Sequence, residues 1–96
     1  MGTKRSCRFQ VVVREGPPRG DLYQLEQAAY FEVMDTKTGD ILLVFQGEMR
    51  AGLSTDTGLW DDYAFSGVRE VTLSPDRQSV LVQHWDGGEE VVLIPG

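Results

Sequence analysis

The chain has 96 residues, of which 41% are hydrophobic and 25% charged, and its formal net charge at pH 7 is -6. This length and composition are typical of one folded domain and exclude an intrinsically disordered chain. No run of about 18 apolar residues is present, so no membrane-spanning helix and no membrane partner are expected. We expect residues 1–96 to form a single domain, with residues 1–7 as a flexible basic leader.

Charge is distributed unevenly along the chain. Residues 1–20 hold five Lys and Arg against Glu15 alone, whereas residues 21–96 hold four against fourteen Asp and Glu. An acidic surface repels the phosphate backbone, so we expect no nucleic-acid partner and a basic or cationic partner instead. Cys7 is the only cysteine, which excludes an intrachain disulfide and predicts a cytoplasmic location.

The first third of the chain predicts one strand and one ambiguous segment. Phe9–Arg14 contains three consecutive valines, whose β-branched side chains fit a pleated sheet. Two prolines make Gly16–Gly20 a loop. The next segment, Asp21–Ala29, is compatible with a short helix capped by its aspartate. The alternation of apolar residues from Leu25 to Val33 favours a long, bent strand instead.

Turn residues between apolar runs predict two hairpins and a further turn. The hairpin turns are Asp35–Asp40 and Asp86–Gly88, and Ser74–Arg77 joins two more strands. The chain is therefore predicted to be all-β, an antiparallel meander of about six or seven strands forming a small barrel or sandwich. The alternative is an α+β fold with one short helix near Asp21 to Ala29. The predicted core consists of Val11, Val13, Phe31, Val33, Leu43, Phe45, Val71, Leu73, Val80, Val82, Val92 and Ile94.

The strand pattern breaks between Glu48 and Gly67, where we predict a long loop. Long loops in a compact domain are more often functional than short connections. Aromatic side chains provide a large contact area at a small entropic cost. We therefore predict a non-catalytic protein-interaction or regulatory module that binds a protein partner or a second copy of itself. Its predicted binding residues lie in an acidic aromatic stretch: Leu59, Trp60, Asp61, Asp62, Tyr63 and Phe65.

One triplet gives an alternative function. Asp56-Thr57-Gly58 resembles the active-site triplet of retroviral-type aspartic proteases, which implies a small homodimeric hydrolase whose two Asp56 carboxyls share a proton. The neighbouring residues depart from that family, because polar Ser54 and Thr55 precede the triplet. His84 is the only histidine, and no complete catalytic set accompanies it. We expect no catalytic residues, no metal and no cofactor.

Overall fold

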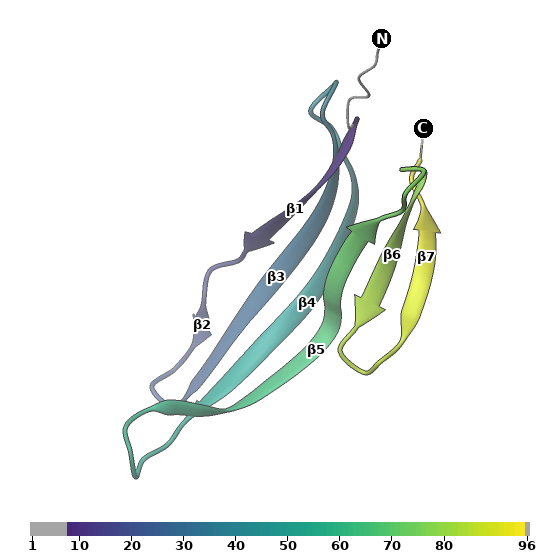
Figure 1. The fold of residues 1–96 in the computed structure, drawn as a ribbon. Coiled ribbons are helices and arrows are strands. Elements are labelled where there is room, and N and C mark those ends of the chain that lie inside the picture. The colour runs from purple at the N-terminus through teal and green to yellow at the C-terminus, as the bar shows by residue number, and fades with distance from the viewer. Residues whose placement is uncertain (1–7, 96) are drawn as a thin grey trace.

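The computed structural model describes residues 8–95, which form seven β-strands and no helix. Neighbouring strands are antiparallel and follow the order β1-β3-β4-β5-β6-β7, with the short β2 paired to β3 (Figure 1). The strands are β1 (Phe9–Glu15), β2 (Arg19–Gly20), β3 (Gln24–Asp35), β4 (Ile41–Leu53), β5 (Trp60–Leu73), β6 (Ser79–His84) and β7 (Glu89–Leu93).

The all-β antiparallel meander predicted from sequence is thus confirmed. Both predicted hairpins are present, as β3–β4 and β6–β7. The alternative helix near Asp21 to Ala29 is wrong, because Gln24 and the residues after it belong to β3. Residues 1–7, where we predict a leader, lie outside the described residues. Within residues 8–95, no helix could cross a membrane.

Strand β5 bends sharply and folds the sheet over itself. Up to Gly67 it pairs with β4, and from Val68 onward it pairs with β6. Gly67 has a φ of 73°, a left-handed conformation that favours glycine. At the bend Gly47 of β4 faces the carbonyl of Val68 so closely that a Cβ on Gly47 would collide with it. The sheet is not closed by hydrogen bonds between β1 and β7.

The hydrophobic core lies between the two halves of this folded sheet. Its buried members are Phe31 and Val33 from β3, and Val68, Val71, Val80 and Val82 from β5 and β6. Partly buried residues packed against them include every other predicted core residue except Val13.

Val13 was predicted to be in the core but is 58% exposed, so that prediction is wrong. It pairs with Phe31, yet β1 approaches β5 only through its first residues: Phe9 and Val11 line a hollow together with Val71 and Leu73. The second layer therefore does not reach Val13.

Beyond the bend, β3, β4 and β5 continue as a single layer that we call the arm, with the short β2 paired along its β3 edge. It comprises residues 24–29 of β3, 46–53 of β4 and 60–66 of β5, at the lower left of Figure 1. The arm explains the elongated shape of 61 × 26 × 21 Å and the radius of gyration of 17.1 Å, against about 12–13 Å for a compact chain of this length. The predicted loop from Glu48 to Gly67 is wrong, since most of it forms the β4–β5 hairpin of the arm.

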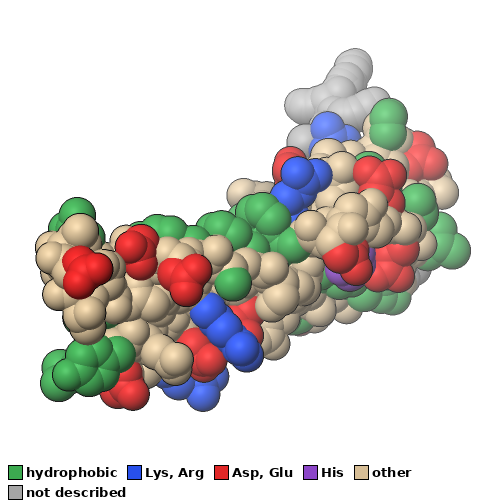
Figure 2. Space-filling view, turned by 90° about the horizontal axis from the view of Figure 1, so that it is seen from below, with side chains coloured by type: hydrophobic (Ala, Val, Ile, Leu, Met, Phe, Trp, Pro, Cys, Tyr) green, Lys and Arg blue, Asp and Glu red, His purple; other side chains and the backbone are tan. Residues whose placement is uncertain are grey.

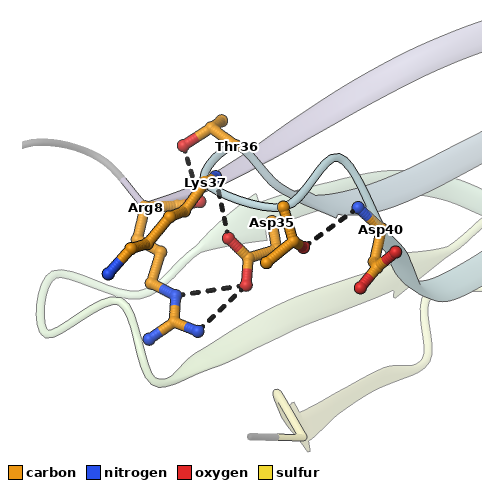
Figure 3. Close-up of polar contacts among 6 residues, drawn as sticks. Arg8, Asp35, Thr36, Lys37 and Asp40 are labelled. Atoms are coloured by element: carbon orange, nitrogen blue, oxygen red, sulfur yellow. Dashed lines mark hydrogen bonds and ion pairs between the residues drawn. The ribbon is translucent and has the colours of Figure 1, made fainter.

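At the end of the molecule away from the arm, a buried carboxylate holds the start of β1 to the turn between β3 and β4. Asp35 is 4% exposed and accepts hydrogen bonds from Arg8 Nε at 3.1 Å, Arg8 Nη2 at 3.0 Å and the Lys37 amide at 2.9 Å (Figure 3). The Thr36 hydroxyl also donates to the Arg8 carbonyl. Chiefly the Arg8 guanidinium, helped by the Lys37 amide, holds the pKa of Asp35 below its usual value despite burial.

This lowered pKa predicts an acid-sensitive contribution to stability. A carboxylate with a lower pKa in the folded state stabilises that state above its usual pKa, and the effect is lost as the pH falls through the lowered value. We expect Asp35→Asn to lower the melting temperature at pH 7 by several degrees, and the difference from wild type to shrink below about pH 4. The measurement is thermal unfolding monitored by circular dichroism between pH 2 and 7, a range that includes the usual pKa of aspartate, about 3.9. Asp40→Asn, in the same turn but exposed, is the control, and an equal loss in both variants would contradict the assignment.

Candidate functional site

Strand register gives the arm one apolar face. In β4, Met49 and Leu53 point to the same side as the core residue Phe45, because side chains alternate along a strand. Pairing adds Phe65 opposite Met49 and Trp60 opposite Leu53. This side continues the core face of the sheet past the point where the second layer ends. We call it the apolar arm face, formed by Leu25, Met49, Ala51, Leu53, Trp60, Tyr63 and Phe65.

A β-bulge in β5 determines which side chains reach this face. Arg50 pairs with Ala64 and Gly52 with Asp61, so β5 carries one extra residue between these pairs. Asp62 has a φ of 58°, which aspartate tolerates better than most residues. A Cβ on Gly52 would lie 3.8 Å from the Cβ of Asp62. The bulge thus places Asp61 and Asp62 on the opposite face and leaves Tyr63 on the apolar one.

The aromatic side chains of the apolar arm face are largely open to solvent. Exposed fractions are 37% for Trp60, 56% for Tyr63 and 48% for Phe65. Trp85, from the turn after β6, stacks on Phe65 with ring centroids 4.5 Å apart and an interplanar angle of 23°. A hollow of about 300 Å³ at the base of the arm is lined by Phe31, Met49, Phe65, Val68 and Trp85, among other residues. The apolar surface therefore runs from the edge of the core out along the arm.

The arm also carries more negative than positive charge. Residues 46–66 contain four Asp and Glu and a single cation, Arg50. Arg50 is already paired with Glu26 at 3.1 Å and Glu48 at 3.2 Å. Among residues 8–95, no Lys or Arg forms an ion pair with Asp61 or Asp62. Figure 2 shows hydrophobic side chains along one margin of the arm, with acidic side chains beside them.

The residues predicted from sequence are brought together in part. Trp60, Tyr63 and Phe65 share one face, whereas Asp61 and Asp62 lie on the other. Leu59 lies in the turn before β5 and is 67% exposed. All but Leu59 belong to a strand and not to the predicted loop.

Sequence reasoning missed several contributors to the surface. Leu25, Met49, Leu53 and Trp85 were not assigned to it. Met49, Ala51 and Leu53 continue the alternation that begins at Leu43, and extending that pattern past Gly47 was the available signal. Nothing in the sequence places Trp85 against Phe65, because that contact depends on the bend in β5.

The other candidate residues lie apart from this surface. Asp56 is exposed at the tip of the β4–β5 turn, where the Gly58 amide donates to the Ser54 carbonyl at 2.8 Å. Catalysis by shared protonation would need a second Asp56 brought beside it by another copy. His84 Nε2 lies 3.2 Å from Glu90 Oε1, across the β6–β7 hairpin. Within residues 8–95, no three His, Cys, Asp or Glu side chains are grouped to hold a metal ion.

Comparison with known proteins gives no match: no family model, no curated protein and no solved structure is similar to this chain. Functional inference therefore depends on the geometry described above.

Proposed function

We propose that this chain is a non-catalytic protein-interaction module that binds a basic partner through the arm. The observation that carries the proposal is the apolar arm face, where Trp60, Tyr63 and Phe65 are each more than a third exposed. Exposed aromatic groups of this kind are concentrated at protein interfaces, where they supply much of the binding energy.

The charge of the arm favours a cationic partner. Asp61 and Asp62 lack an ion-pair partner among the described residues, and the whole chain carries a net charge of -6. A basic protein would be attracted to this surface before contact and oriented on it. A second copy of the chain would be repelled by the same charges, so a heterologous partner is the better fit.

The test is affinity capture from the native cell with the full chain as bait, followed by identification of the retained proteins. We expect Trp60→Ala combined with Asp62→Asn to reduce retention of the specific partner at least about tenfold, because an aromatic contact with the partner and a charge are both lost. Asparagine keeps the positive φ accessible at the bulge. The retained partner is expected to present a basic surface.

The control removes equivalent groups from outside the arm. Leu93 is 75% exposed on β7, and Glu89 is an exposed acid on the same strand. Leu93→Ala combined with Glu89→Gln should retain the partner at the wild-type level, with both variants melting close to wild type. If the arm variant captures as well as wild type, or if the control loses the partner equally, the arm is not the binding surface.

A further inference from the structure

The arm has a free sheet edge on β5. From Val68 to Leu73 this strand pairs with β6. From Trp60 to Ser66 it pairs with β4 alone, and no described strand lies on its other side (Figure 1). About half of the backbone N–H and C=O groups in this stretch therefore face solvent. Strand β6 ends at His84, and no described strand continues beside β5 past that point.

We propose that the partner supplies an extended segment with alternating basic and apolar residues, which adds to β5 at Trp60–Ser66 as a new strand in line with β6. This proposal rests on the proposed function and specifies its binding mode and the chemistry of the partner. Strand addition gives affinity through main-chain hydrogen bonds and specificity through alternate side chains.

The two faces of β5 match the two kinds of side chain in such a segment. Side chains of an added strand alternate between the faces of the sheet. One set would lie beside Tyr63 and Phe65, which belong to the apolar arm face. The other set would lie on the face that carries Asp61 and Asp62, where positive charge is needed. A segment with the reverse charge would place carboxylates against these aspartates.

A hollow that can hold a side chain lies where the free edge of β5 begins, next to Gly67. Here the amide of Trp85 donates to the carbonyl of Gly67 at 3.0 Å, the last backbone contact on this side of β5 before the edge becomes free. The hollow has a volume of about 270 Å³ and is lined by Phe65, Ser66, Gly67, His84, Trp85 and Asp86. Its walls include the stacked rings of Phe65 and Trp85, which suit an apolar side chain at the end of the added strand.

Charge also decides between a foreign strand and a second copy. Edge strands without protection tend to pair with each other, and Trp60–Ser66 contains neither lysine nor proline. Pairing of two such edges would bring two Asp61–Asp62 pairs together in an already acidic dimer. A basic strand meets no such repulsion, so the edge is protected against self-pairing while open to this partner.

The experiment uses the full chain and a fluorescent, acetylated eight-residue peptide of alternating lysine and valine. Eight residues span about 27 Å and so cover the free edge. We expect the peptide to bind by fluorescence anisotropy, and a peptide of alternating glutamate and valine to bind at least about tenfold more weakly. Binding should slow hydrogen exchange of amides within residues 60–66.

Backbone methylation separates strand addition from side-chain docking. Two versions of the lysine–valine peptide carry N-methyl groups on alternate amides, one on the valines and one on the lysines. Only one of these sets faces β5, so one version should lose at least about tenfold in affinity while the other is much less affected. Equal binding by both versions would overturn strand addition.

Charge variants of the protein supply the matched control. Asp61→Asn combined with Asp62→Asn should weaken the peptide at least about threefold and reduce the salt dependence of binding. Asp40→Asn combined with Glu70→Gln removes the same charge from exposed positions outside the arm and should leave binding unchanged. Equal weakening in both double variants would overturn the assigned site.

The outcomes distinguish this inference from the function on which it rests. If the peptide fails to bind while capture of the partner still depends on Trp60, the strand-addition mode is wrong and the arm remains a binding surface. If sedimentation shows a dimer that Asp61→Asn with Asp62→Asn strengthens, the edge serves a second copy and the basic partner is wrong. If capture is indifferent to Trp60, the proposed function itself fails.

Discussion

Replacing Gly47 by alanine is expected to lower the free energy of unfolding by at least about 3 kcal/mol. The new Cβ would collide with the backbone carbonyl of Val68, at the point where β5 crosses from one layer of the sheet to the other. A backbone atom cannot move aside as a flexible side chain can, so the bend itself would have to shift. Since a domain of this size has a total stability of about 5–10 kcal/mol, such a loss is a large fraction of it.

The measurement is urea unfolding monitored by circular dichroism, with Gly39→Ala as the matched control. Gly39 lies in the β3–β4 turn and has a φ of 81°, but a Cβ there would meet nothing within 4 Å. Its replacement should cost only the left-handed conformation, about 1–2 kcal/mol. The steric interpretation of the bend fails if alanine at position 47 costs no more than alanine at position 39.

Replacing Phe31 by alanine is expected to cost about 3–5 kcal/mol, the usual range for removing a buried phenylalanine. Phe31 is 8% exposed and belongs to the buried cluster that joins the two layers. Removing its ring leaves a cavity beneath β5 and β6, and also opens the hollow at the base of the arm. Both layers lose contacts, so the whole domain should be destabilised and not β3 alone.

Val13→Ala provides the control for Phe31, measured by the same urea unfolding. The two residues are direct cross-strand partners on the same side of the sheet, but Val13 is 58% exposed. We expect Val13→Ala to lower the free energy of unfolding by less than about 1 kcal/mol, because surface substitutions rarely cost more. Comparable losses at both positions would mean that the second layer covers β1 more fully than the packing of Phe9 and Val11 indicates.

The hairpins could be predicted because each is specified by turn residues that are adjacent in the sequence. Asp35 and Gly39 at one turn, and the Asp86–Gly88 sequence at another, specify the turns within a few residues. The meander follows, since each strand pairs with a neighbour in the chain. The long strand from Gln24 was likewise readable from its alternation.

The arm was missed because its irregularities interrupt the alternation of apolar residues in β4 and β5. The bulge at Asp62 shifts the phase of β5, and Gly47 interrupts the apolar alternation of β4. A second irregularity, between Val68 and Glu70, has the same effect and explains why Val68 was missed as a core residue. A two-residue period fails wherever a strand contains an extra residue.

The candidate site was partly predicted for a physical reason. Aromatic and acidic residues are visible in sequence, so Trp60, Asp61, Asp62, Tyr63 and Phe65 were found. Their division between two faces was not, because it depends on the bulge. The contribution of Trp85 was also hidden, since it comes from a turn twenty residues after Phe65 and depends on how β5 folds back.

The single-layer construction of the arm makes its length adjustable in steps. Among residues 8–95, no second layer packs on the outer part of the β4–β5 hairpin, so removing two residues from each strand would shorten its reach by about 7 Å without touching the core. Removing one residue from each would instead turn every outer side chain to the wrong face. Insertions and deletions in this hairpin are therefore expected to be tolerated in even numbers per strand, and each such pair of residues changes the length of the free edge of β5 by one repeat of the strand.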